Sequence, residues 1–153
     1  MKQKVLFVRL DPNAKVPHKA HKDDFCFDLV ATSCTEVAPN VYKYGTGLAL
    51  QISDNDKANY RETSNSTSFE LRPRSSVWKT GMLLSNCVGT IDEGYTGEIS
   101  AVFYHVMPDM PRYQVGDRIA QICFQRANEL EFKKVDKFNK TERGAGGYGS
   151  SGK

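Results

Sequence analysis

Two arginines and two serines fall within five residues, in the stretch RPRSS at 72–76. A guanidinium presents a fork of donors that matches phosphate oxygens, and serine hydroxyls and neighbouring N–H groups add further donors. The stretch therefore favours an anion site, although an ordinary polar turn explains it equally well when it is taken alone.

Two polar residues interrupt otherwise apolar stretches. Asp28 lies inside FCFDLVA at 25–31, where a carboxylate costs free energy unless it is paired, hydrogen-bonded or placed at a cavity. Gln121 follows the turn-like GDR in VGDRIAQICF at 115–124, and a buried glutamine needs partners. Taken alone, Asp28 reads as an aspartate of a turn or strand end, and Gln121 as either a satisfied core group or a ligand contact.

The stretch SNCVGTIDEGYTGEISAVF at 85–103 predicts a strand, a tight turn and a second strand. Asp92 and Glu93 occupy the turn, two glycines permit it, and Tyr95 projects from it. An acidic, glycine-containing hairpin tip is usually structural, so by itself this stretch does not require a site.

The last eleven residues, RGAGGYGSSGK at 143–153, hold five glycines and two serines. This composition is typical of a flexible tether. Arg143 and Tyr148 supply a charge and a ring, however, so the alternative is a lid that orders when a ligand binds.

The sequence pattern predicts short strands as the elements that position these polar residues. Apolar residues alternate or run continuously at 5–10, 25–30, 47–52, 69–72, 87–91, 99–104, 119–124 and 130–135. No long stretch has a helical period, and the one candidate is a short turn at 75–79. The pattern predicts an all-β barrel or jelly roll, with the polar stretch 53–68 as a surface loop or a long hairpin.

Composition limits the function classes. The 153 residues suffice for one domain with a core, and the net charge of +3 is too mild to indicate a nucleic-acid partner. No apolar run reaches the roughly 18 residues that cross a membrane, and MKQKVLFVRL is too short in its apolar run for a signal peptide. The four cysteines form no C-x-x-C pair and no zinc spacing with the histidines, which favours reduced, mostly buried thiols of an intracellular, cytoplasmic protein.

Taken in this order, the segments PRSS, GTIDEGYTGE, GDRIAQ and RGAGGYGSSGK, with the stretch around Asp28, resemble the five motifs of the trimeric dUTPase family. The resemblance extends from Phe25 to Lys153. Two departures stand out: Cys26 replaces a usual small residue or glycine, with consequences for the turn there, and Tyr148 replaces phenylalanine.

The resemblance implies a distorted jelly roll of the β-clip type, with a β domain over 1–142 and a flexible lid over 143–153. It implies a homotrimer whose active sites draw on more than one subunit. It also implies hydrolysis of dUTP to dUMP and pyrophosphate, which limits uracil incorporation into DNA and supplies dUMP for thymidylate synthesis. The setting would be the cytoplasm, or that of a host cell for a viral protein.

The resemblance also implies roles for residues. Asp92 would position the water that attacks the α-phosphorus, and Asp28 would hold waters of a Mg²⁺ ion. Tyr95 would pack on the deoxyribose, and Asn86 and the backbone around Ser100 would contact uracil. The remaining substrate-binding residues would be Arg74, Ser75, Ser76, Gly89, Gln121, Arg143, Gly146, Gly147, Tyr148, Ser150 and Ser151.

Three alternative functions agree less well with these residues. A dCTP deaminase shares the fold and an RSS segment, but its catalytic glutamate would fall at Val102, which cannot transfer protons. A non-catalytic regulatory module would not need Asp28, Asp92, Gln121 and Arg143 together. A structural jelly-roll protein would not need the arginine and glycine tail.

Overall fold

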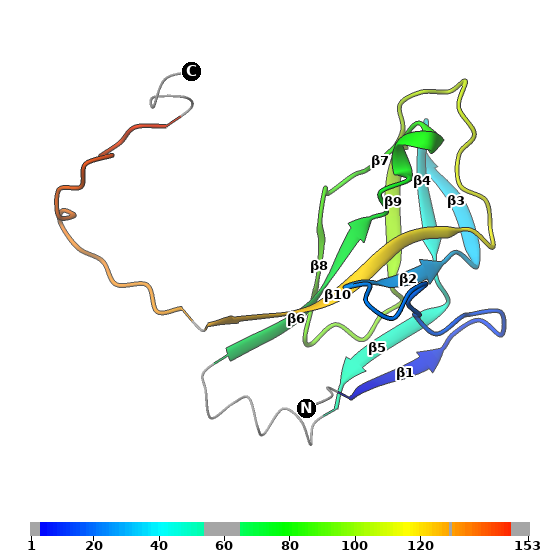
Figure 1. Ribbon diagram of the computed structural model, residues 1–153, viewed down its shortest axis with the longest axis horizontal. Helices are drawn as coiled ribbons and strands as arrows, with labels where there is room; N and C mark the ends of the chain where they lie inside the picture. The colour runs from blue at the N-terminus through cyan, green and yellow to red at the C-terminus, as the bar shows by residue number, and fades with distance from the viewer. Residues whose placement is uncertain (1–3, 54–64, 129, 148–153) are drawn as a thin grey trace.

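The computed structural model describes residues 4–53, 65–128 and 130–147. In that part of the chain the secondary structure is β-strands and one turn of 3-10 helix, arranged as Figure 1 shows. The elements are β1 Val5–Arg9, β2 Phe27–Val30, β3 Ser33–Ala38, β4 Val41–Gly45, β5 Leu48–Ile52, β6 Asn65–Pro73, η1 Val77–Thr80, β7 Met82–Leu84, β8 Gly89–Asp92, β9 Ser100–His105 and β10 Arg118–Asn128. The prediction of an all-β fold is therefore confirmed.

The strands form three antiparallel sheets. Two have four strands, in the orders β2-β10-β6-β8 and β3-β4-β9-β7, and β1 pairs with β5 in a third. Every second side chain of a strand faces the space between the two four-stranded sheets. Phe69 and Leu71 on β6 and Ala101 and Phe103 on β9 are buried there, whereas Tyr104, which faces the other way, is half exposed. One hydrophobic core thus holds both four-stranded sheets in place.

Three strands were not predicted, namely β3, β4 and β7. On β3 most side chains are exposed and polar, and β7 has only three residues, so neither carries a strong apolar pattern. The β3–β4 turn includes Asn40 with a φ of 60°, a conformation that asparagine tolerates. Tyr42 and Tyr44, buried on either side of exposed Lys43, were the signal that would have identified β4.

Three predicted segments differ from the structure. The polar stretch 53–68 is not all loop, because 65–68 belong to β6 and pair with β10; residues 54–64 lie outside the described part. The predicted strand at 130–135 is absent, and Leu130 and Phe132 are 73% and 91% exposed. The segment 87–91 begins as a turn, because Cys87 has a φ of 57° and β8 starts only at Gly89.

Among the described residues no helix is long or apolar enough to cross a membrane.

Candidate active site

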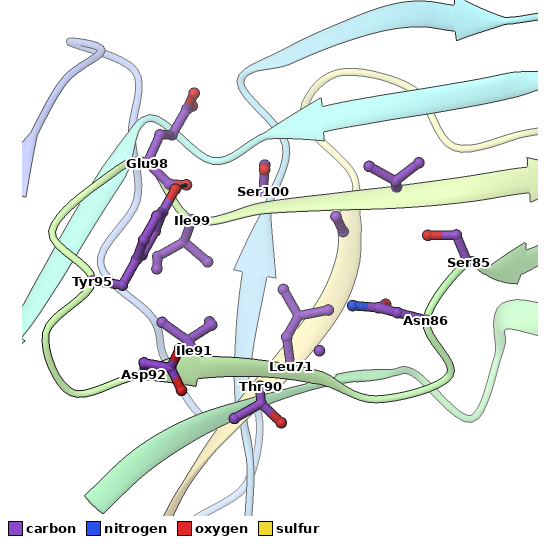
Figure 2. A pocket seen from close by; sticks show the side chains of 13 residues that line it. Leu71, Ser85, Asn86, Thr90, Ile91, Asp92, Tyr95, Glu98, Ile99 and Ser100 are labelled. Carbon is purple, nitrogen blue, oxygen red and sulfur yellow. Dashed lines mark hydrogen bonds between the residues drawn. The ribbon is translucent and has the colours of Figure 1, made fainter.

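The two strands predicted to form a hairpin at 85–103 are present, but they do not pair with each other. They belong to different sheets, since β8 pairs with β6 while β9 pairs with β4 and β7. The seven residues between them cross from one sheet to the other, and the strands splay apart around a cavity of about 220 Å³ (Figure 2). We call this cavity the Asp92 pocket.

Backbone edges form the two walls of the Asp92 pocket. The outer edge of β8 is a sheet edge and makes no ladder. On β9, the ladder with β7 stops at Phe103 and a last hydrogen bond joins Ser85 N–H to Val102 O at 2.9 Å, so Ser100 and Ala101 have no β7 partner. Two strand edges with donors and acceptors therefore face the cavity, over an apolar base that includes Leu71.

Asn86 and Tyr95 lie near opposite ends of the Asp92 pocket in Figure 2. The Tyr95 hydroxyl donates to the Glu98 carbonyl at 3.0 Å, which folds the ring over the turn. A Cβ at Gly97 would stand 2.5 Å from that hydroxyl oxygen, so only glycine permits this placement of the ring. At the other end, Gly89 is buried beside Asn86, and a Cβ there would lie 3.1 Å from the Asn86 amide nitrogen.

Asp92 ends β8 and is exposed at the mouth of the pocket. The following turn is held by Thr67, whose hydroxyl donates to a Glu93 carboxylate oxygen at 2.6 Å. The structure thus brings together all five residues that were predicted for this segment: Asn86, Gly89, Asp92, Tyr95 and Ser100.

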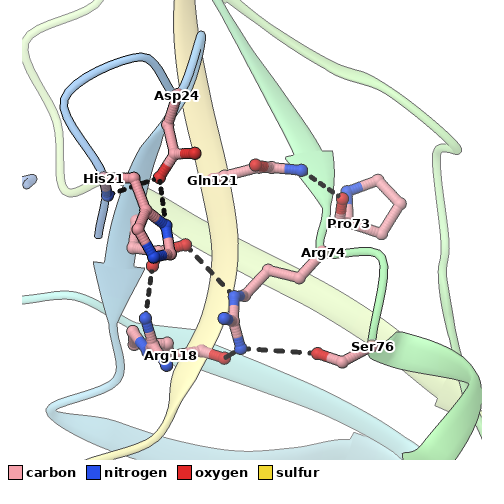
Figure 3. A network of polar contacts seen from close by, with 8 residues as sticks. His21, Asp24, Pro73, Arg74, Ser76, Arg118 and Gln121 are labelled. Atoms are coloured by element: carbon pink, nitrogen blue, oxygen red, sulfur yellow. Dashed lines mark hydrogen bonds and ion pairs between the residues drawn. The ribbon is translucent and has the colours of Figure 1, made fainter. Parts of the chain in front are cut away.

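A second, polar cavity of about 450 Å³ surrounds Asp28, and we call it the Asp28 pocket. Arg74 Nε donates to one carboxylate oxygen of Asp28 at 3.1 Å, and Arg118 Nη1 donates to the other at 2.9 Å (Figure 3). Asp28 is thus a paired carboxylate at a cavity, which removes the cost expected of a lone one. Arg118 was not predicted; its signal was the GDR motif, but only the β2–β10 pairing brings it to Asp28.

The other residues predicted to contact phosphate gather around Arg74. Ser75 and Gln121 line the Asp28 pocket, and Arg74 Nη1 donates to Ser76 Oγ at 3.4 Å. Gln121 donates to the Pro73 carbonyl at 2.9 Å, which satisfies one of its two amide hydrogens. Arg72, by contrast, is bound to Glu70, and this contact raises the pKa of its guanidinium; of the two arginines in RPRSS, Arg74 is the one in the pocket.

Cys26 does not distort the start of β2, because it is not among the residues with positive φ. Burial, followed by its contact with Cys123, raises the pKa of the Cys26 thiol. The prediction of mostly buried thiols holds for Cys123 alone; Cys26 and Cys34 are half-buried, and Cys87 is exposed.

The described residues of the predicted lid, 143–147, line neither pocket of the single chain. After β10 the chain runs away from the sheets (Figure 1), and Arg143 Nε donates to the Gly146 carbonyl at 2.9 Å within this exposed segment. Gly147 is exposed as well. Tyr148, Ser150 and Ser151 lie outside the described residues.

The donor set of the Asp28 pocket fits a hydrated Mg²⁺ ion that arrives with a phosphate ligand. Among the described residues no group of three acidic, histidine or cysteine side chains could enclose a metal. Each oxygen of Asp28 accepts from one arginine and keeps lone-pair capacity for a water. Mg²⁺ commonly keeps several waters and takes its other ligands from substrate phosphates, so one water-accepting carboxylate suffices.

Comparison with known sequences gives one consistent result. The sequence pattern of the dUTPase family matches residues 12–152. Deoxyuridine 5'-triphosphate nucleotidohydrolase of Nocardia farcinica is 38% identical over 147 residues, which cover 94% of this chain and 82% of that protein. The enzyme of the same name from Corynebacterium glutamicum is 34% identical and covers 97% and 95% of the two chains.

Solved structures share the fold. The dUTPase of Staphylococcus bacteriophage 80alpha, bound to dUpNHpp, aligns with a TM-score of 0.79 at 24% identity over 97% of this chain and 98% of that one. A mutant dUTPase from phage phi11 of S. aureus, with a coordinated structural Mg(II) ion, aligns with a TM-score of 0.68 at 20% identity over 90% and 99%. With a matched pattern over almost its full length and relatives above 30% identity, the chain belongs to the dUTPase family.

Proposed function

We propose that this protein hydrolyses dUTP to dUMP and pyrophosphate. The observation that carries the proposal is the Asp92 pocket, in which two unpaired strand edges and Asn86 surround a cavity with a carboxylate at its mouth. Family membership supports the same activity.

The base would be selected by the two strand edges. Fixed backbone donors and acceptors can pair with uracil O4 and N3–H, whereas cytosine would leave them mismatched, and unpaired buried polar groups are costly. Asn86, from the loop before β8, adds an amide that can donate and accept. The ring of Tyr95, held by its bond to Glu98, would pack on the deoxyribose and crowd a 2′-hydroxyl.

Asp92 would accept a hydrogen bond from the attacking water and aim it at the α-phosphorus. A carboxylate is a weak base, so the main contribution of Asp92 would be to position the water about 3–3.5 Å from the phosphorus. The β- and γ-phosphates then leave as pyrophosphate. Stabilisation of the charge that develops on the phosphate oxygens falls to other groups.

Those groups would come from the Asp28 pocket. Arg74, Ser75, Ser76 and Gln121 offer donors to phosphate oxygens, and Arg118 adds a second guanidinium near Asp28. Asp28 would accept hydrogen bonds from waters on Mg²⁺, and the ion would supply charge neutralisation on the triphosphate when bound.

The two pockets of one chain are too far apart to serve one nucleotide. Asp28 is in register with Arg72 through Gln121, and Asp92 is in register with Ser68, four residues away on β6. Asp28 and Asp92 are three strands apart in the sheet, which is about 14 Å across the strands, and four residues apart along them, which is about 13 Å. The two aspartates are therefore about 20 Å apart. We therefore infer that each active site pairs the Asp28 pocket of one subunit with the Asp92 pocket of another.

A homotrimer is the assembly that we propose for this sharing. The segment 130–135 has an alternating pattern but no strand partner in its own chain, and both Leu130 and Phe132 are exposed. An apolar, strand-like segment of this kind is expected to be covered by another copy of the chain. The residues 143–153 would act as a lid over the shared site, with Arg143, Gly146, Gly147, Tyr148, Ser150 and Ser151 completing the contacts.

Mixed trimers test the shared site. Asp28→Asn and Asp92→Asn subunits, each inactive alone, are denatured together in equal amounts and refolded. If a site draws Asp28 and Asp92 from different subunits, about a quarter of the sites contain both wild-type residues and activity returns to about that level. If both come from one chain, no site is intact and the mixture stays inactive; refolded wild-type protein controls for recovery.

Substrate choice tests the activity itself. Pyrophosphate release is measured with dUTP, dCTP, dTTP and UTP under the same conditions, with ammonia release from dCTP followed in parallel. We expect strong preference for dUTP and no ammonia, because the deaminase position is Val102, which lines the Asp92 pocket without a carboxylate. Comparable turnover of dCTP, or ammonia from it, would contradict the proposal.

A further inference from the structure

Two cysteines lie near each other where β2 pairs with β10. β2 and β10 pair with Gln121 opposite Asp28 and Ile122 opposite Phe27. The same register, continued to the residue just before β2, places the half-buried Cys26 opposite the buried Cys123. Burial, and then the neighbouring Cys123 thiol, raise the pKa of Cys26.

Backbone geometry suits a covalent bond between them. The N–H of Asp28 donates to the His18 carbonyl at 2.8 Å and so points away from β10. Because hydrogen-bonded and non-hydrogen-bonded pairs alternate along an antiparallel ladder, Asp28 and Cys26 both occupy non-hydrogen-bonded positions opposite β10. Cα atoms in such pairs are about 4.5 Å apart, within the range of about 4.4–6.8 Å that a disulfide spans.

The other two cysteines have different surroundings. Cys34 is half-buried against the core and faces Tyr44 across the β3–β4 pairing, and Cys87 is exposed in the turn after β7. Gln125 Nε2 donates to Cys123 Sγ at 3.6 Å. Of the four cysteines, all of which the structure describes, only Cys26 and Cys123 face each other across a strand pairing.

We propose that Cys26 and Cys123 form a reversible disulfide when the protein meets a low-molecular-weight disulfide such as oxidised glutathione. Cys26, the more exposed of the two, attacks as thiolate and releases one reduced glutathione, which leaves a mixed disulfide. The Cys123 thiolate then attacks Cys26 Sγ and releases the second glutathione. The two protein thiols give up two electrons and two protons, and one glutathione disulfide becomes two glutathione thiols.

The bond would clamp a strand that carries a site residue. β2 has four residues and lies at the edge of its sheet, with β10 as its only ladder partner there. A covalent link two rungs from the Asp28–Gln121 pair would hold the start of β2 to β10. We expect the oxidised protein to melt at a higher temperature than the reduced protein, because the link restricts the unfolded chain.

The experiment treats the full-length, folded protein with oxidised glutathione and measures intact mass, peptide linkage after digestion without reductant, and melting temperature. We expect the loss of two hydrogen masses per chain, a cross-link between the Cys26 and Cys123 peptides, and a raised melting temperature that returns to its starting value with dithiothreitol. Cys87→Ser should keep all three results. Cys26→Ser at the half-buried position and Cys123→Ser at the buried one should each abolish the cross-link and the melting shift.

Other outcomes would overturn the proposal. These are glutathione retained on Cys26, a link between any other pair of cysteines, or oxidation confined to Cys87. An unchanged melting temperature in a fully cross-linked sample would refute the clamp. These readouts need no substrate, so they stand or fall independently of the proposed hydrolysis.

Discussion

At the scale of single residues, the two aspartates Asp28 and Asp92 have different surroundings. Both oxygens of Asp28 accept from arginines in a polar cavity, whereas Asp92 stands exposed at the end of β8 beside a cavity with an apolar base. In the proposed mechanism, Asp28, held by two guanidiniums, would accept hydrogen bonds from waters on Mg²⁺, and the exposed Asp92 would hold the attacking water. The roles proposed for them follow from these neighbours rather than from the residue type.

Asp92→Asn should lower kcat by about a hundredfold or more while the Kd for a non-hydrolysable dUTP analogue changes little. The amide keeps the shape but cannot accept the proton of the attacking water, and a group used mainly in the transition state affects kcat more than affinity. Steady-state kinetics and calorimetric titration measure the two quantities. Asp109→Asn, in an exposed turn, is the matched control and should retain wild-type values; a near-normal kcat in Asp92→Asn would refute the role.

Gly97→Ala should weaken discrimination against UTP by about tenfold without a large loss of stability. The added methyl would collide with the Tyr95 hydroxyl at 2.5 Å, and a flexible ring is the group that yields. The ratio of kcat/KM for dUTP over UTP measures the effect. Gly94→Ala is the control, since a Cβ there meets nothing within 4 Å, and equal ratios in the two variants would show that the ring does not guard the sugar.

At the scale of elements, the decisive feature is that β8 and β9 diverge. A hairpin ladder would have paired the backbone groups of the two strands with each other and left none for a ligand. Because β8 instead joins β6 and β9 joins β4, their facing edges border a cavity. The core residues that hold the two sheets at this separation, with Tyr44 of β4 among them, therefore also hold the pocket open.

Tyr44→Phe tests that core through pH. Tyr44 is fully buried, its hydroxyl donates to the Tyr113 carbonyl at 2.8 Å, and burial together with Cys34 raises its pKa. Because the pKa of Tyr44 is raised in the folded protein, its hydroxyl ionises at a lower pH in the unfolded chain than in the folded one. The contribution of the neutral hydroxyl to folding stability is therefore present below about pH 10 and is lost as the pH rises further. The variant should be less stable by about 1 kcal/mol at pH 7 and lose stability less steeply above about pH 10.

Urea unfolding at a series of pH values measures this slope. Tyr104→Phe, on an exposed position of β9, is the matched control and should follow the wild-type curve. Identical alkaline slopes for Tyr44→Phe and wild type would show that Tyr44 does not couple to folding.

At the scale of the whole molecule, the residues of the proposed active site lie in two separate pockets of one chain. The Asp28 and Asp92 pockets share no lining residue, and the segment after β10 leaves the body of the chain. Assembly with other copies is the proposed means of joining them. The tail then belongs to function more than to folding, because its described part is almost wholly exposed.

Removal of 143–153 should leave the melting temperature unchanged and lower turnover by about a hundredfold or more. The glycine-rich segment buries too little apolar surface to offset its ordering cost of about 1–2 kcal/mol per residue, so it cannot stabilise the core. The loss of even one donor to a developing charge typically costs about 3 kcal/mol. Thermal melting and steady-state kinetics test both halves; turnover within about threefold of wild type would refute the lid.

Much of this protein could be predicted from its sequence. Alternating apolar residues indicated β5 and β9, continuously apolar runs indicated β1, β2 and β10, and the motif order indicated the family that the comparisons confirm. Asp28 was predicted to hold waters of Mg²⁺, and Arg74, Ser75 and Gln121 were predicted to contact phosphate. These residues come from three segments that are distant in sequence, and they line one pocket. These features depend on residue type and short spacing, which the linear sequence displays directly.

Tertiary structure alone decided which strand lies beside which. Turn residues after Asp92 suggested a hairpin, and the pattern at 130–135 suggested a strand, but pairing depends on partners that local sequence does not specify. The same holds for the contact of Arg118 with Asp28 and for the position of Cys26 opposite Cys123, both set by the register of β2 on β10. Register follows from burying one face of each strand in a shared core, and that free energy is a property of the assembled sheets.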